Sequence, residues 1–337
     1  MKIAILSPIA WRTPPESYGP WEQVASTITE GLVARGHKVS LFASGNSITS
    51  AKLRSVCKLP YESDSSADPK VLECLHISKL MESATNFDII HNHFDFLPLT
   101  YSSLIKTPII TTIHGFSSPK IIPVYKKYDG SVAYISISNS DRHKELTYLD
   151  TIYHGVDPSF FTFRNNKENY LLYFGRIHPE KGLHRAIEIA ENSNIPLKIA
   201  GLIQDESYFK KKIEPKIDGE HIQYLGNLGK EDRDVLLGGA KALLHPISFE
   251  EPFGLSVLEA MMCGTPVIAF ARGSMPELIK DKVSGFLVTT ISEAVLAVQK
   301  LDQINPEDCR AYAEKKFSVD IMIDSYIEAY KKVIENF

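Results

Sequence analysis

The chain begins the same kind of fold twice. Each beginning is a short apolar run typical of a buried strand, then a loop with glycine, a stretch of helical periodicity and a second apolar run. The first set of runs lies at residues 3–7, 22–35 and 38–43. The second set lies at residues 170–174, 183–192 and 196–200. A strand, a helix and a further strand in this order form a βαβ unit, so the sequence predicts two α/β domains.

Further apolar runs extend the sheet of each predicted domain. In the first half they lie at residues 88–91, 108–113, 133–137 and 151–153. In the second half they lie at residues 221–225, 242–245, 266–270 and 285–288. The segment 154–168, with a glycine, an Asp-Pro pair and a polar run, is predicted to link the domains. The amphipathic stretch 319–335 is predicted to be a helix that either caps the second domain or crosses back onto the first.

The bulk properties exclude several classes of function. A formal net charge of −4 gives no general affinity for nucleic acid or for an anionic membrane surface. No apolar run approaches the roughly 18 residues that a membrane-spanning helix needs. The apolar N-terminus is too short for a signal peptide and is predicted to be the first strand. The 4 cysteines are scattered without a C-x-x-C pair, which is typical of reduced thiols in a cytoplasmic protein.

Residues 249–266 give the strongest indication of function in the sequence. They place Glu251 in a loop and Glu259 about a turn and a half inside a helix predicted for 255–262. A helix N-terminus offers unpaired N–H groups to phosphate, and carboxylates accept hydrogen bonds from hydroxyls. The two carboxylates are too far apart for an acid/base pair. They indicate two hydroxyl clamps with an anion site between them, which fits a sugar nucleotide.

A bare pair of glutamates at this spacing has a simpler interpretation. A surface loop that leads into an amphipathic helix would carry the same two residues. The following residues 263–269 favour the first interpretation, because they form a tight turn that feeds a buried strand. A helix, a turn and a strand in this order are part of an α/β nucleotide-binding unit.

Charged and histidine side chains follow several predicted strands. Arg176 and Lys181 share one strand-to-helix loop, where both could reach a pyrophosphate, although two solvated surface cations would give the same pattern. His114 ends a predicted strand and could hydrogen-bond a sugar hydroxyl, or could be a polar strand end without a role. His91 and His93 are predicted to line a cleft, since no further ligands for a zinc site are evident.

At this point several segments together resemble the family-4 (group 1) retaining glycosyltransferases of the GT-B fold. The segments are 18–22, 35–39, 112–115, 154–157, 174–182 and 250–269, with residues from 317 onward similar to the family's closing helix. The resemblance implies an α/β protein with two Rossmann-like domains whose parallel sheets face each other across a cleft. Residues 1–155 with 320–337 would form the acceptor-side domain, and 156–319 the donor-binding domain.

The resemblance also implies roles for matching positions. Arg176 and Lys181 would hold the donor diphosphate, and Glu259 would bind the ribose hydroxyls. The transferred sugar would be held by Glu251 and the backbone of Phe253, Gly254 and Leu255. No metal site is implied.

In the first domain the resemblance implies that Gly19 lets a loop approach the phosphates and that His114 lies beside the reacting sugar. The catalytic set would then be His114, Glu251, Arg176 and Lys181. Two positions depart from the family pattern, with Pro20 in place of a second glycine and His154 in place of the usual asparagine. Pro20 has no N–H and cannot donate to a phosphate.

The predicted function is that of a retaining hexosyltransferase. It would move a sugar from a nucleotide-diphosphate sugar, with UDP favoured, to the hydroxyl of a glycan, a lipid-linked sugar or a small molecule. It would need no cofactor, and it would work in the cytoplasm or peripherally at the inner face of the membrane. Two alternatives stay open, a UDP-sugar 2-epimerase of the same architecture and a non-catalytic sugar-nucleotide-binding protein. The absence of a Gly-x-Gly-x-x-Gly motif weighs against dinucleotide binding.

Overall fold

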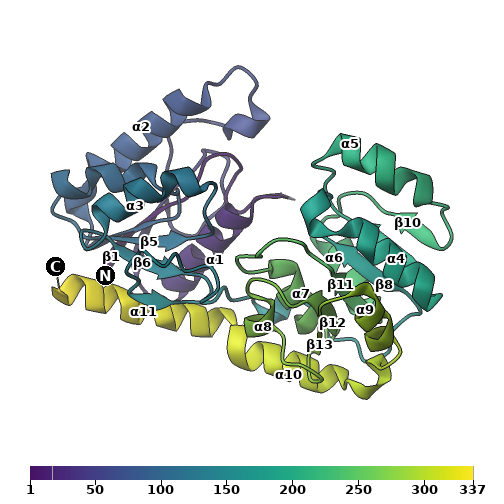
Figure 1. Cartoon of the computed structure of the whole chain (residues 1–337). Helices are drawn as coiled ribbons and strands as arrows, with labels where there is room; N and C mark the ends of the chain where they lie inside the picture. The colour runs from purple at the N-terminus through teal and green to yellow at the C-terminus, as the bar shows by residue number, and fades with distance from the viewer. Residues whose placement is uncertain (17, 337) are drawn as a thin grey trace. The chain divides into compact units, whose positions relative to one another are not determined.

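The chain divides into two compact units in a computed structural model that describes residues 1–16 and 18–336. Unit 1 comprises Met1–Gly155 and Val319–Phe337, and unit 2 comprises Val156–Ser318 (Figure 1). The predicted domain bounds place the second border one residue later than this division. Ser17 and Phe337, which the predicted ranges include, lie outside the described residues.

Unit 1 is built on a seven-stranded parallel sheet with the order β3-β2-β1-β4-β5-β6-β7. Its strands are β1 (Lys2–Leu6), β2 (Lys38–Phe42), β3 (Lys52–Arg54), β4 (Ile89–Asn92), β5 (Ile109–Ile113), β6 (Ala133–Ser136) and β7 (Asp150–Thr151). The central strands β1, β4 and β5 are almost fully buried, as expected for a parallel sheet covered on both faces. The strand order reverses between β1 and β4.

Helices cover both faces of this sheet. They are α1 (Pro20–Ala34), α2 (Pro69–Met81), α3 (Ile122–Tyr128) and α11 (Val319–Asn336), with short 3-10 turns that include η1 (Tyr61–Ser63) and η3 (Leu97–Leu104). The helix α1 begins at Pro20, which suits a first turn because proline has no N–H to leave unpaired.

The last helix, α11, belongs to unit 1. It packs on α1 so closely that a Cβ at Gly31 would lie 2.5 Å from Cγ1 of Ile323. Arg35 at the end of α1 forms ion pairs of 2.8 Å with Asp320 and Asp324. The alternative left open by the sequence is thereby resolved, since this helix crosses back onto the first unit.

Unit 2 repeats the architecture with a six-stranded parallel sheet in the order β10-β9-β8-β11-β12-β13. Its strands are β8 (Leu171–Phe174), β9 (Leu197–Ala200), β10 (Ile222–Tyr224), β11 (Ala242–His245), β12 (Val267–Phe270) and β13 (Gly285–Val288). Its helices are α4 (Leu183–Ser193), α5 (Glu206–Tyr208), α6 (Lys230–Gly239), α7 (Leu255–Met262), α8 (Met275–Leu278), α9 (Ile291–Val298) and α10 (Pro306–Phe317). Here the strand order reverses between β8 and β11.

The predicted linker 154–168 is wrong for most of its length. Phe161 is buried, and its carbonyl accepts a hydrogen bond of 2.9 Å from Arg310 of α10. The backbone N–H of Thr162 donates to Asp234 at 2.7 Å. These contacts fix the segment onto unit 2, so the chain passes between the units only around residues 155–156 and 318–319. The polar composition of this segment does not distinguish the two cases, because surface loops of a domain are as polar as interdomain linkers.

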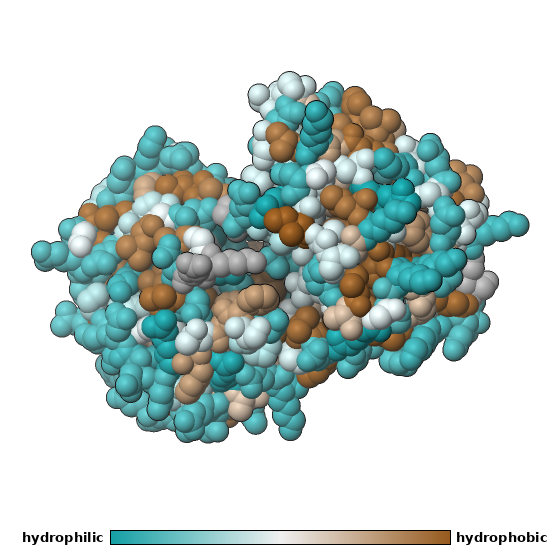
Figure 2. All heavy atoms as spheres, turned by 180° about the vertical axis from the view of Figure 1, so that it is seen from behind, coloured by the Kyte–Doolittle hydropathy of each residue, from teal (hydrophilic) through white to brown (hydrophobic). Residues whose placement is uncertain are grey.

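The face of the molecule drawn in Figure 2 is mostly polar. Figure 2 shows one face on which hydrophilic side chains predominate and apolar ones lie in separate groups. Within the described part of the chain, no helix combines the length and the apolar character that crossing a bilayer requires.

Candidate functional site

The predicted donor residues of unit 2 gather where its strand order reverses. The strand β8 leads into the loop with Arg176 and Lys181, and its neighbour β11 leads into the loop with Glu251. Carboxyl ends of parallel strands lie at the same edge of a sheet, and ligands of open α/β sheets bind at such a reversal point. The topology therefore brings together the loops that carry Lys181 and Glu251, although these residues are 70 positions apart in the sequence.

Lys181 and Glu251 form a buried ion pair. The ammonium group of Lys181 donates to the carboxylate of Glu251, and Nε2 of His245 lies 3.5 Å from the same carboxylate oxygen. The side chains of Lys181 and Glu251 are 14% and 11% exposed. Burial by itself would raise the pKa of Glu251, but Lys181 and His245 outweigh it and lower that pKa to about 2. Glu251 is therefore a fixed negative charge.

His245 is a site residue that the sequence did not single out. It ends β11, and burial lowers its pKa although Glu251 raises it. A neutral imidazole beside Glu251 leaves Lys181 as the cation of the pair. The sequence does contain a signal for His245, because it is a histidine at the carboxyl end of a predicted strand. The same criterion identifies His114.

The other two predicted donor side chains have separate partners. Arg176 donates to the side-chain oxygen of Gln204 and lies 3.7 Å from Glu180. Glu259 lies 3.4 Å from a guanidinium nitrogen of Arg233, a residue of α6 that is not among the predicted site residues. No spacing pattern links Arg233 to Glu259, because the two residues lie on different helices.

The helix α7 begins at Leu255, four residues after Glu251, and no side chain caps its first turn. Its N-cap is Gly254, which has φ of 102° and provides no side chain to cap the helix. The preceding Phe253 is buried, and its carbonyl accepts a hydrogen bond from the hydroxyl of Ser274. A helix N-terminus that no side chain caps suits an anion, because the positive end of the helix dipole lies there. The roles of Phe253, Gly254 and Leu255 toward a sugar stay predictions.

In unit 1, His114 follows β5 in a cluster of buried rings. It is 9% exposed, its Nε2 is hydrogen-bonded to Nδ1 of His93 at 2.9 Å, and it stacks on Trp21 with ring centroids 5.5 Å apart. Burial, with the neighbouring His93 and His154, holds the pKa of His114 well below its ordinary value. His114 is therefore neutral at physiological pH and suited to hydrogen bonding.

His91 and His93 do not line a cleft as predicted, because both side chains are 0% exposed. His91 is hydrogen-bonded at 2.7 Å to Tyr330 of α11 and to Thr112 of β5. His91 thus joins the sheet to the closing helix, whereas His93 is hydrogen-bonded to His114. A pattern of alternate histidines at a strand end does not reveal that both are covered.

Gly19 makes room for a buried carboxylate. Its φ is 145°, and a Cβ there would lie 2.9 Å from Cβ of Pro15 and 3.1 Å from Oε2 of Glu22. Glu22, in the first turn of α1, accepts a hydrogen bond of 3.2 Å from the backbone N–H of Trp11. Burial raises the pKa of Glu22 to about 7. The approach of Gly19 to a phosphate stays a prediction, and Glu22 was missed although it ends the motif 18–22.

The histidine cluster predicts a loss of stability in acid. Burial lowers the pKa of His91, His93, His114 and His154, the last to about 3, against an ordinary value of 6.5. The unfolded chain therefore binds more protons below pH 6.5, and the stability present above that pH is lost as the pH falls. Glu22 acts in the opposite direction between pH 7 and 4.5, because its raised pKa favours the folded state there.

The histidines whose pKa is lowered outnumber the carboxyl groups whose pKa is raised, which are Glu22, Glu73 and Asp95, so the free energy of unfolding should fall between pH 7 and 5. Each unmatched proton contributes up to about 1.4 kcal/mol per pH unit. Urea unfolding at a series of pH values measures this slope, and His154→Asn should make it shallower by about one proton. A flat profile, or an unchanged slope in that variant, would contradict the neutral state of the cluster.

Two family models match the chain. The model described as Glycosyl transferases group 1 matches residues 158–316, and the model described as Glycosyltransferase Family 4 matches residues 22–160. Among curated proteins, the O-antigen chain mannosyltransferase C of Escherichia coli is 23% identical over 362 residues, which cover 96% of this chain and 96% of that protein.

Solved structures share the fold over nearly the whole length. The sucrose-phosphate synthase from Thermosynechococcus elongatus superposes with a TM-score of 0.81 at 17% identity and covers 100% of both chains. HepE from Anabaena, in complex with UDP, superposes with a TM-score of 0.76 at 18% identity and covers 98% of this chain and 100% of its own.

Proposed function

Because this chain belongs to the group 1, family 4 glycosyltransferases of the GT-B fold, we propose that it transfers a sugar with retention from a UDP-sugar to an acceptor hydroxyl. Membership of this family makes the chain a transferase that takes a nucleotide-sugar donor and an acceptor. The observation that carries the finer proposal is the largely buried pair of Lys181 and Glu251 near the N-terminus of α7, which no side chain caps. A cation, a carboxylate and a helix N-terminus at one sheet edge suit a ligand that combines phosphates with hydroxyls.

The chemistry proposed for the site is a substitution at the anomeric carbon on one face. The bond from that carbon to the phosphate oxygen breaks, and the acceptor oxygen forms its bond on the same side. The departing phosphate oxygen takes the proton of the acceptor hydroxyl. Arg176 and Lys181 would stabilise the charge that develops on the diphosphate, and Glu251 would hold hydroxyls of the sugar.

The same cations support the proposal that no metal or other cofactor is needed, since they can carry the charge that a metal would otherwise carry. Activity should then survive treatment with a chelator. UDP is favoured as the donor's nucleotide, and the complex of the structurally similar HepE with UDP agrees with that choice. The cytoplasmic location, with peripheral contact at the inner face of the membrane, stays a prediction of the sequence.

Donor binding is expected to raise the melting temperature. A ligand at 100 times its dissociation constant stabilises the folded state by about 2.7 kcal/mol, which corresponds to a shift of roughly 5–10 °C in a domain of this size. Thermal melts with UDP-glucose, GDP-mannose and ADP-glucose compare the nucleotides directly. UDP-glucose should give the largest shift, and equal shifts or none would contradict the proposed donor.

A matched pair of variants locates the nucleotide. Glu259→Gln should reduce the shift, because Glu259 is assigned to the ribose hydroxyls. Glu250→Gln is the control, since the side chain of Glu250 is 69% exposed and belongs to the same region of the chain.

NMR of the product tests whether the transfer retains the anomeric configuration. Conversion of the donor to its 2-epimer without any acceptor would identify the alternative enzyme.

A further inference from the structure

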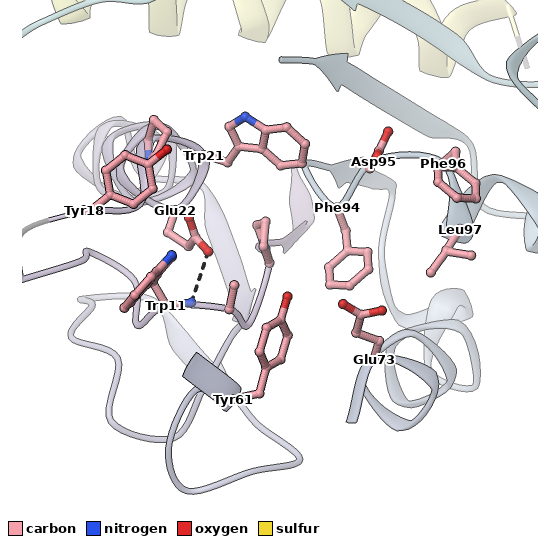
Figure 3. Close-up of a pocket in the computed structure, with 13 residues that line it drawn as sticks. Trp11, Tyr18, Trp21, Glu22, Tyr61, Glu73, Phe94, Asp95, Phe96 and Leu97 are labelled. Atoms are coloured by element: carbon pink, nitrogen blue, oxygen red, sulfur yellow. Dashed lines mark hydrogen bonds between the residues drawn. The ribbon is translucent and has the colours of Figure 1, made fainter. Parts of the chain in front are cut away.

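Unit 1 contains a cavity of about 490 Å³ at the carboxyl ends of β1 and β4 (Figure 3). Its walls come from the loop after β1, the start of α1, η1, α2 and the segment after β4. The strand order of this sheet reverses between β1 and β4, so the cavity lies where an open α/β sheet binds its ligand. None of the predicted donor side chains lines it.

Aromatic side chains form much of the wall. They are Trp11, Tyr18, Trp21, Tyr61, Phe94 and Phe96. Figure 3 shows them arranged around an open space, with Trp21 on one side and Tyr61 with Phe94 on another. Aromatic walls of this kind combine a large apolar face with polar tips, which suits a ligand that has one apolar face and a polar edge.

The polar part of the wall is acidic. It contains Glu22, Glu73 and Asp95, and within the described residues no lysine, arginine or histidine lines the cavity. Burial raises the pKa of each of these carboxyl groups. A phosphate or carboxylate ligand would meet three acidic groups and no countercharge, which is unfavourable in a partly buried site. Hydroxyl groups fit well, because carboxyl oxygens accept their hydrogen bonds and a protonated carboxyl also donates one.

One of these groups is held in place by its surroundings. Asp95 has φ of 71°, a conformation that is uncommon outside glycine. Its carbonyl accepts a hydrogen bond of 2.8 Å from Asn92, and its carboxylate accepts one from Tyr125. These hydrogen bonds hold Asp95 in the wall of the cavity.

We propose that this cavity holds the acceptor and that the acceptor presents an uncharged pyranose ring, stacked on the aromatic wall and hydrogen-bonded to Glu22 and Glu73. The inference rests on the proposed function, which supplies the donor, and it narrows the acceptor to a neutral sugar. Sugar phosphates and small organic acids are excluded as the group that enters the cavity.

Binding without the donor tests the cavity separately from the transfer reaction. Saturation-transfer NMR and calorimetry would use methyl α-glucopyranoside, methyl α-mannopyranoside and methyl β-galactopyranoside, with glucose 6-phosphate as the charged comparison. At least one methyl glycoside should bind, and glucose 6-phosphate should bind at least tenfold more weakly. Equal or tighter binding of the phosphate, or no binding of any methyl glycoside, would overturn the proposal.

Two variants show whether binding occurs in this cavity. Glu73→Gln should weaken binding of the methyl glycoside about tenfold, because a neutral amide oxygen is a weaker hydrogen-bond acceptor than a carboxylate. Glu62→Gln is the control, since Glu62 is exposed on η1 next to Tyr61 and does not line the cavity. Equal effects of the two variants would overturn the assignment. If methyl glycosides bind but neither donor binding nor transfer occurs, the proposed function fails and the cavity assignment stands.

Discussion

Transfer activity should be lost when Lys181 is replaced with methionine. Loss of one group that stabilises developing charge lowers kcat by roughly a hundredfold to a thousandfold. The variant also leaves Glu251 buried without its cation, which costs about 3–5 kcal/mol of stability. A fall in activity alone would therefore not separate a catalytic effect from unfolding.

A double variant separates the two effects. Lys181→Met with Glu251→Gln removes both charges, so most of the stability should return while activity stays absent. Urea unfolding and a coupled assay of UDP release measure the two quantities on the same protein. The control is Lys198→Met, whose ion pair with Glu168 is more exposed and should contribute at most about 1 kcal/mol. Near-normal turnover in the Lys181 variant would show that the site is misassigned.

The second large effect is expected from Gly182→Ala. Gly182 precedes α4 with φ of 76°, and a Cβ there would lie 2.1 Å from the carbonyl oxygen of Pro246. The loop that carries Lys181 is thus in backbone contact with the loop that leads to Glu251. Alanine would force the two loops apart. The free energy of unfolding should therefore fall, and the ion pair between Lys181 and Glu251 should be broken.

Gly219→Ala is the matched control for this change. Gly219 has φ of 79°, but a Cβ there would meet nothing within 4 Å. Both variants carry the cost of a left-handed residue, roughly 1–2 kcal/mol, and only Gly182→Ala adds the clash. The difference between their free energies of unfolding measures the close approach of the loops, and similar values would show that the loops separate easily.

The elements of the fold were readable because apolar runs and glycine-bearing loops are local signals. The strand β11 and the helix α7 begin and end at the predicted residues. The closing helix was also found, although its amphipathic pattern did not say which unit it covers. That answer depends on the contact between Gly31 and Ile323, which lie at opposite ends of the chain.

The candidate site was less predictable because its contacts follow from strand order. Lys181 and Glu251 were assigned to different parts of the donor, whereas the structure pairs them across the reversal between β8 and β11. Arg233 was missed since its role depends on a neighbour from another helix, whereas His245 could have been found from its position at the end of a strand. The burial of His91 and His93 was also unpredictable, because α11 covers part of that cluster from the far end of the chain.

The return of α11 to unit 1 has a consequence for synthesis on the ribosome. Unit 2 is one continuous segment and can close as soon as residue 318 has emerged. Unit 1 is translated first but stays incomplete, with the face of α1 around Gly31 uncovered until Ile323 arrives. The unit that is translated first is thus completed after the other one, because α11 (Val319–Asn336) covers a domain whose other parts are translated before all of unit 2.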